Sequence, residues 1–127
     1  MHRAILIIGL PGSGKTFLIK EKFSNGDYVV IDDPKDSLLI SDMISVGRDL
    51  VIADAHLCDK LVRNSALCSL SAAGYEVSEI FFDNDPEKCK ANIAFRNDGR
   101  VIKDLTTFHY TIPPHAKERT RKIWQNE

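Results

Sequence analysis

The eight residues from Gly9 to Thr16 constrain the fold of this chain more than any other stretch. They read Gly-Leu-Pro-Gly-Ser-Gly-Lys-Thr and match the pattern G-x-x-x-x-G-K-[ST] of a phosphate-binding loop. Residues 3–8 before the loop form a largely apolar run typical of a strand, and residues 17–22 after it are typical of a helix. Because the motif requires a strand before the loop and a helix after it, the stretch predicts an α/β fold.

The residue types in this loop suit a bound nucleotide. Glycines allow backbone angles closed to other residues and let the chain come close to an anion. The backbone N–H groups of the loop then point at phosphate oxygens, at the positive end of the helix dipole. Lys15 is expected to reach the β- and γ-phosphates of ATP, and the Thr16 hydroxyl to hold Mg²⁺. The residues expected to bind the nucleotide here are Gly9, Pro11, Gly12, Ser13, Gly14, Lys15 and Thr16.

The rest of the chain alternates between strand and helix signals. Apolar runs predict strands at 3–8, 28–31, 50–53 and 77–82. Capping and periodicity signals predict helices at 17–23, 34–46, 58–73, 86 to about 98 and 114–125, and residues 100–113 are expected to be irregular. This order predicts a parallel sheet with helices on both faces, built as one domain over residues 1–127. In such sheets ligands bind beyond the carboxyl ends of the strands.

Acidic residues follow two of the predicted strands. Asp32 and Asp33 come after the second strand, where a carboxylate could orient a hydroxyl or accept its proton. Asp54 ends the third strand, where it could hold Mg²⁺. Each position has a structural alternative, because Asp33 before Pro34 is a good helix N-cap and an Asp is common where a strand passes into a loop.

Arg96 and Arg100 are four residues apart, so a continuous helix would place both on one face. Arginine forms bidentate contacts with phosphate oxygens and keeps its charge. With the glycine between them, the segment from about 96 to 104 could form a mobile lid that excludes water from ATP. The alternative is a pair of solvated cations at the end of a helix.

Composition excludes several classes of protein. No apolar run is long enough to cross a membrane, and the first strand begins at residue 3, so neither a membrane span nor a signal peptide is expected. Three cysteines without metal-ligand spacing indicate reduced thiols, which predicts a cytoplasmic protein, in the host cytoplasm if it is viral.

The net charge of −1 disfavours nonspecific coating of nucleic acid, although the charge is uneven along the chain. From Arg96 to Glu127 the chain carries seven Lys or Arg against four Asp or Glu, a local balance of +3. This region either faces phosphates or forms a solvated helix face.

Taken together, these residues resemble the small P-loop kinases of the polynucleotide kinase type, to which a phage 5′-hydroxyl polynucleotide kinase belongs. The resemblance rests on residues 8–16, on the Asp32-Asp33 pair, on Asp54 and on the stretch Arg96-Asn97-Asp98-Gly99-Arg100. It implies a P-loop kinase fold, Asp33 as the general base, and Arg96 and Arg100 as contacts of the ATP phosphates.

The chain departs from this family at the acceptor side. Members of the family have an arginine shortly after the Asp pair and a longer segment between the second and third strands, whereas this chain has Lys35 and a short segment. Either Lys35 replaces that arginine at a 5′-hydroxyl end, or the acceptor differs from the family's. The related acceptor is 5-hydroxymethyluracil within DNA, which is also a primary hydroxyl of a polynucleotide.

Two other functions use the same parts. One is a kinase for a nucleotide, a nucleoside or another small metabolite, and the other is a nucleotide-dependent switch, for which the guanine-specificity sequence N-K-x-D is missing. The expected partners are ATP, Mg²⁺ and a nucleic-acid substrate, with neither a membrane nor an obligate protein partner.

Overall fold

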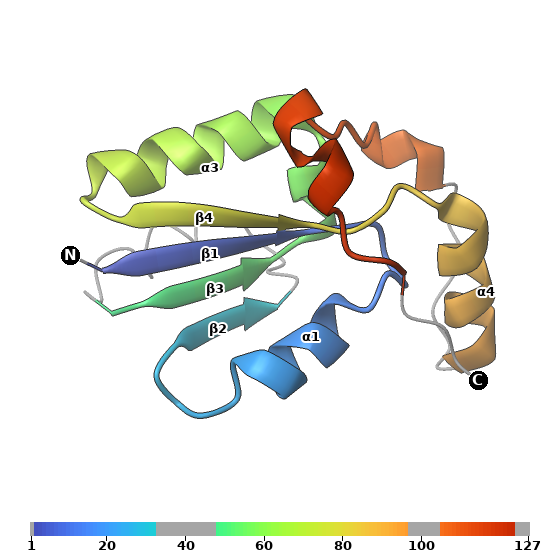
Figure 1. The fold of residues 1–127 in the computed structure, drawn as a ribbon, viewed down its shortest axis with the longest axis horizontal. Helices are drawn as coiled ribbons and strands as arrows, with labels where there is room; N and C mark the ends of the chain where they lie inside the picture. The colour runs from blue at the N-terminus through green and yellow to red at the C-terminus, as the bar shows by residue number, and fades with distance from the viewer. Residues whose placement is uncertain (1, 33–47, 97–104, 124–127) are drawn as a thin grey trace.

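A computed structural model describes residues 2–32, 48–96 and 105–123 and shows an α/β protein built on one parallel sheet (Figure 1). Its strands are β1 (Arg3–Ile8), β2 (Val29–Asp32), β3 (Leu50–Ala53) and β4 (Glu76–Phe81). They lie in the order β2-β3-β1-β4, and each neighbouring pair is parallel. The predicted bounds of β1 and β3 are confirmed, and those of β2 and β4 are shifted by one residue.

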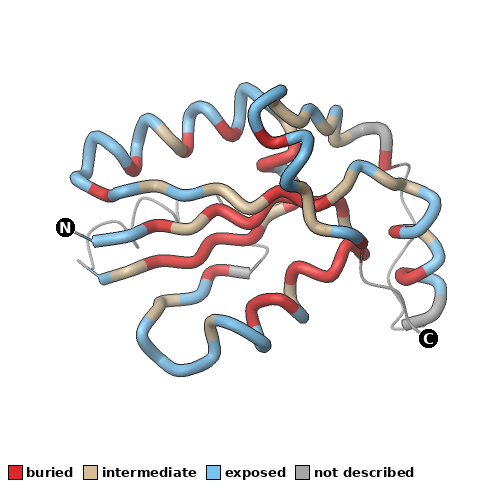
Figure 2. The backbone as a smooth tube through the Cα atoms, viewed as in Figure 1, coloured by how far each residue is buried: buried red, intermediate tan, exposed pale blue. Residues whose placement is uncertain are grey.

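The two central strands form the core. Every residue of β3 is buried, and β1 is buried from its second residue onward apart from the half-buried Ile5 (Figure 2). A strand covered on both faces cannot alternate apolar and polar residues, which explains the continuous apolar runs in the sequence.

Two helices cover opposite faces of the sheet. The helix α1 (Lys15–Lys22) connects β1 to β2, and α3 (Lys60–Ala72) connects β3 to β4. The two crossovers run in opposite directions across the sheet, so right-handed connections place their helices on opposite faces (Figure 1). This confirms the predicted layers of helix, parallel sheet and helix.

The helix α4 (Pro86–Arg96) lies at the carboxyl end of the sheet (Figure 1). Its predicted start is confirmed, because the Asp85 side chain accepts a hydrogen bond from the Lys88 backbone N–H at 3.2 Å. Proline at the first helical position adds a fixed φ angle that suits the helix.

The predicted helix over residues 58–73 starts later than expected. A 3₁₀ helix, η1 (Ala55–Cys58), comes first, and α3 begins at Lys60. Two aspartates produce this division, since Asp54 caps the backbone N–H of His56 and Asp59 caps that of Leu61.

The predicted last helix over residues 114–125 is wrong. A 3₁₀ helix, η3 (Pro114–Arg119), ends at an extended Thr120, and Arg121 then forms a parallel bridge with Phe82. The backbone N–H of Arg121 donates to the Phe81 carbonyl, and that of Asp83 donates to the Arg121 carbonyl, each at 2.8 Å. Pairing with the edge of the sheet thus replaces the local helical hydrogen bonds. Another 3₁₀ helix, η2 (Leu105–Phe108), lies within the stretch expected to be irregular.

Several predictions lie outside the described residues: the helix over 34–46, and the part of the lid segment from 97 to 104. Among the helices that the structure describes, none combines the length and the apolar character needed to cross a membrane.

Candidate phosphate-binding site

The sheet topology brings the ends of β1 and β3 together. After β1 the chain turns to α1 on one face, and after β3 it turns to α3 on the other. Ile7 lies opposite Ala53 in the ladder, so the chain beyond β1 and the chain beyond β3 leave the sheet side by side. A crevice forms at such a switch point, and ligands of parallel α/β sheets bind there. The loop that begins at Gly9 lies on one side of this point, and Asp54 on the other.

The glycines of the loop are required by its geometry. Gly12 and Gly14 have φ angles of +86° and +107°, in the left-handed region that side chains disfavour. A Cβ atom on Gly12 would lie 2.4 Å from the carbonyl oxygen of Cys89 in α4. The loop therefore needs glycine at Gly12 both for its turn and for its close contact with α4.

Lys15 is buried within the loop although it carries a charge. Its Nζ atom donates to the carbonyl of Gly9 at 2.8 Å and to that of Leu10 at 3.1 Å. These bonds hold the ammonium group against the loop, next to the N-terminus of α1. Gly14 caps that helix without a side chain over its end, so the positive end of the dipole faces the loop.

The donor chemistry of the loop fits a nucleotide phosphate. A buried ammonium group, a helix N-terminus and a backbone that approaches without side chains are the features that bind phosphate oxygens. Thr16 lies in the first turn of α1, where its hydroxyl could coordinate a metal ion that also binds a phosphate oxygen.

Ser13 is fully buried, and its Oγ atom has no hydrogen-bond partner among the described residues. A Cβ atom added to Gly9 would lie 2.5 Å from this oxygen, so the hydroxyl fills the space that a larger residue at Gly9 would need. Buried polar groups are nearly always paired, which makes this hydroxyl an energetic cost of the loop.

Asn92 fixes α4 to the loop. Its Nδ2 atom donates to the Gly12 carbonyl at 2.9 Å, and the side chain is buried. Sequence reasoning missed this residue, although an amide at the three-residue spacing from the apolar Cys89 was a usable signal. The bond joins the loop to the helix that ends at Arg96.

Asp54 lies where the sequence placed it, directly after β3. Its Oδ1 atom accepts from the backbone N–H of His56 and contacts His56 Nδ1, both at 2.9 Å. The residue therefore caps η1, and one carboxylate oxygen is engaged in that role. Within the described ranges, no three His, Cys, Asp or Glu side chains are grouped around a metal position. A Mg²⁺ ion at Asp54 would thus take its other ligands from Thr16, from phosphate oxygens and from water, as Mg²⁺ commonly does.

Asp32 is the last residue of β2 and lies opposite Ala53 in the ladder, so it lies at the same carboxyl end of the sheet as Asp54. Arg96 is the last residue of α4. Asp33 and Arg100, together with the side chains of Asp32 and Arg96, lie outside what the structure describes.

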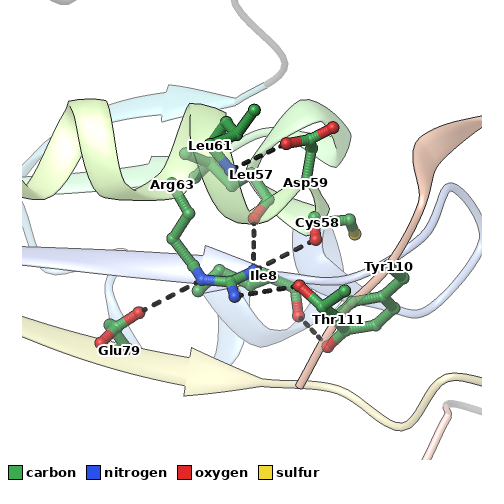
Figure 3. Close-up of polar contacts among 9 residues, drawn as sticks. All are labelled: Ile8, Leu57, Cys58, Asp59, Leu61, Arg63, Glu79, Tyr110 and Thr111. Carbon is green, nitrogen blue, oxygen red and sulfur yellow. Dashed lines mark hydrogen bonds and ion pairs between the residues drawn. The ribbon is translucent and has the colours of Figure 1, made fainter. Parts of the chain in front are cut away.

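The buried Arg63 of α3 connects η1 to the C-terminal segment, and sequence reasoning missed it (Figure 3). Its guanidinium donates to the carbonyls of Leu57 and Cys58 at 3.0 and 3.1 Å and to Thr111 Oγ1 at 3.3 Å. It also lies 3.8 Å from the Glu79 carboxylate. The signal was its position, three and seven residues before the buried Ala66 and Leu70 on the same helix face.

Tyr110 attaches the C-terminal segment to the end of β1. Its hydroxyl lies within hydrogen-bond distance of two carbonyls, that of Ile8 at the end of β1 (Figure 3) and that of Phe82 directly after β4. Burial raises the pKa of this hydroxyl above its usual value of 10. Tyr110 therefore stays neutral and donates at all physiological pH values.

Two thiols lie in the buried part of the site. Burial raises the pKa of Cys58 to about 12 and that of Cys89 to about 11, while the Lys15 ammonium acts in the opposite direction on both. The cysteines are unpaired, as the sequence predicted, and the exposed one is Cys68. Because the thiolate is the nucleophile, Cys58 and Cys89 are inert packing residues at neutral pH.

No family model matches the chain. Among curated proteins, the chain is similar to the uncharacterized protein R277 of Acanthamoeba polyphaga mimivirus. The two sequences are 33% identical over an alignment of 126 positions, and the match covers 91% of each chain.

Proposed function

The chain belongs to the same family as the mimivirus protein R277 and, because that relative's name assigns no activity, we propose a function from the phosphate loop itself. The chain is a kinase of the P-loop fold that transfers the γ-phosphoryl group of ATP, with Mg²⁺, to a hydroxyl of a nucleic acid. The observation that carries this proposal is the loop after β1, where left-handed glycines surround a buried lysine at a helix N-terminus.

The residues of the chain divide the reaction among them. Lys15 and the first turn of α1 bind the β- and γ-phosphates, and Thr16 and Asp54 hold Mg²⁺, which neutralises charge on the phosphate oxygens. Asp33, or its neighbour Asp32, orients the acceptor hydroxyl and takes its proton. The hydroxyl oxygen forms a bond to the γ-phosphorus while the bond to the bridging oxygen breaks, and ADP leaves.

Arg96 and Arg100 close over the phosphates in this proposal and exclude water, which would otherwise accept the phosphoryl group. The hydrogen bond between Asn92 and Gly12 supports such a role, because it fixes α4, and with it the backbone at Arg96, to the phosphate loop.

The acceptor is the 5′-hydroxyl end of a polynucleotide or the hydroxymethyl group of 5-hydroxymethyluracil in DNA. The order of the loop, the Asp pair, Asp54 and the two arginines supports it through the resemblance to polynucleotide kinases. Unpaired buried thiols are compatible with a reducing compartment, so we place the protein in the cytoplasm, that of the host if it is viral.

The test is transfer of label from γ-labelled ATP, with Mg²⁺, to a panel of acceptors. The panel holds 5′-hydroxyl DNA and RNA, DNA with 5-hydroxymethyluracil, nucleosides and nucleoside monophosphates. We expect label on a polynucleotide, and we expect Lys15→Ala to abolish transfer while Lys20→Ala, on the exposed side of α1, retains it. Label only on small molecules would make the protein a metabolite kinase, and ATP binding without any transfer would make it a switch protein.

A further inference from the structure

A groove of about 480 Å³ runs along the outer edge of β4, apart from the phosphate loop. One side is formed by Ser78, Glu79 and Phe81 of β4, and the other by His115, Arg119 and Arg121 of the C-terminal segment. In the part of the chain that the structure describes, the outer edge of β4 is paired only at the bridge between Phe82 and Arg121. The groove therefore continues along an otherwise open sheet edge.

Two arginines and one carboxylate line the groove, Arg119 and Arg121 on the C-terminal segment and Glu79 on β4. The segment from 114 to 123 as a whole contains four Lys or Arg and one Glu. The one carboxylate that lines it, Glu79, is already close to the buried guanidinium of Arg63, with Nε and Oε2 3.8 Å apart. Among the described residues, neither Arg119 nor Arg121 forms an ion pair, and the only hydrogen bond of their side chains is from Arg119 to the His115 carbonyl at 3.4 Å. Both guanidinium groups can therefore bind an added anion.

The shape of the groove favours a chain over a small ion. It is an open trough along four residues of a strand, without the closed pocket that a single phosphate would need. Phe81 is buried, so the exposed His115 is the one aromatic ring of the lining that a base could reach. Two arginines along an open trough suit the repeating phosphates of a nucleic-acid backbone.

The groove lies at the same end of the sheet as the phosphate loop. Phe81 is opposite Ile8 in the ladder, and the loop begins at the next residue, Gly9. Neighbouring strands are about 5 Å apart, so a few nucleotides of an extended chain cover the distance from the loop to the groove. A strand whose reactive hydroxyl lies at the loop can continue across the end of β4 into the groove.

We infer that this groove binds the phosphodiester backbone of single-stranded nucleic acid and holds the acceptor strand while its hydroxyl reacts. The inference rests on the proposed kinase function for its purpose, but binding itself does not require catalysis. Arg119 and Arg121 contact two successive phosphates and recognise no base, so the site is tolerant of sequence.

The experiment measures binding of a dye-labelled, 5′-phosphorylated single-stranded oligonucleotide by fluorescence anisotropy, without ATP, over a series of salt concentrations. Wild type is compared with Arg119→Gln/Arg121→Gln and with Lys20→Gln/Lys22→Gln, a matched variant that removes two exposed cations from α1. We expect the arginine pair to raise the Kd about tenfold and to lower the slope of log K against log salt by about 1.4, the value for two contacts with a single strand. The lysine pair changes the Kd less than about twofold.

A third variant, Arg119→Lys/Arg121→Lys, keeps the charge and is expected to recover most of the affinity. Equal losses in the arginine and lysine pairs would overturn the inference, because they would show a diffuse charge effect. Displacement of the oligonucleotide by inorganic phosphate at equal concentration would overturn it as well, in favour of a small-anion site. If the arginine variant alone loses binding while no acceptor in the panel takes label, the groove stands and the kinase function fails. If an acceptor takes label but the arginine variant binds the oligonucleotide as tightly as wild type, the kinase function stands and the groove proposal fails.

Discussion

Gly9 and Ser13 are packed so closely that the Ser13 hydroxyl occupies the space that a side chain at Gly9 would need. A Cβ atom on Gly9 would lie 2.5 Å from Ser13 Oγ and 3.1 Å from Phe82 Cβ. We expect Gly9→Ala to destabilise the fold by about 1–3 kcal/mol through overpacking. Ser13→Ala removes an unpaired hydroxyl and is expected to be neutral or to stabilise by about 1 kcal/mol.

The double variant Gly9→Ala/Ser13→Ala tests whether these effects are coupled. We expect it to be more stable than the sum of the single variants predicts, since removing the oxygen relieves the closest contact. Urea unfolding of the four proteins measures the coupling energy, and additive effects would contradict the packing described for the loop.

Asp33 has two possible roles, as a helix cap and as the base of the proposed reaction. Asn caps a helix about as well as Asp, so Asp33→Asn separates the roles. If Asp33 takes the proton, this variant retains its thermal stability and loses roughly 10²–10⁴ in kcat, as measured with γ-labelled ATP and the identified acceptor. Asp32→Asn is the matched control, and a larger loss there would move the role to Asp32.

At the scale of elements, the contact of α4 with the loop is the one that sequence reasoning did not anticipate. The Asn92 amide binds the Gly12 carbonyl at 2.9 Å in a buried position. We expect Asn92→Ala to leave that carbonyl unpaired, to cost about 1–3 kcal/mol of stability, and to raise the KM for ATP more than it changes kcat. Asn64→Ala, at an exposed position of α3, is the control. A loss of stability with an unchanged KM would show that α4 supports the fold without positioning the loop.

Helix and strand boundaries followed from local signals wherever local hydrogen bonds decide them. The apolar runs of β1 and β3 and the Asp85-Pro86 start of α4 are of this kind. The stretch after Pro114 failed because its backbone pairs with β4, a partner more than thirty residues earlier in the chain. A local pattern carries no information about such a partner.

For the whole molecule, the burial of two thiols and one tyrosine hydroxyl makes the free energy of unfolding change with pH in the alkaline range. The pKa values of Cys58 and Cys89 rise from 9.0 to about 12 and about 11, and that of Tyr110 also rises. Above about pH 9 the unfolded chain loses protons that the folded chain retains. Stability is therefore fully present below this pH and falls as the pH rises toward the folded pKa values.

We expect the free energy of unfolding, measured by urea denaturation, to fall between pH 9 and pH 10.5, by up to about 1.4 kcal/mol per pH unit for each group that ionises only in the unfolded chain. Cys89→Ala should make this slope shallower, whereas Cys68→Ser, at an exposed position, should leave it unchanged. A slope that is the same in all three proteins would contradict the assignment to buried thiols.

Local patterns in the sequence were enough to predict the strand–loop–helix unit at Gly9–Thr16, the parallel sheet with helices on both faces, and the place of Asp54 after β3. Glycines, caps and apolar runs act within a few residues, so their effects can be read along the chain. Three contacts could be found only in the folded chain: Asn92 binds the loop, Arg63 and Tyr110 attach the C-terminal segment to the end of the sheet, and Arg119 and Arg121 line a groove beside β4. Each of those contacts joins residues distant in sequence, and the free energy of burying and pairing them arises only once the sheet has formed.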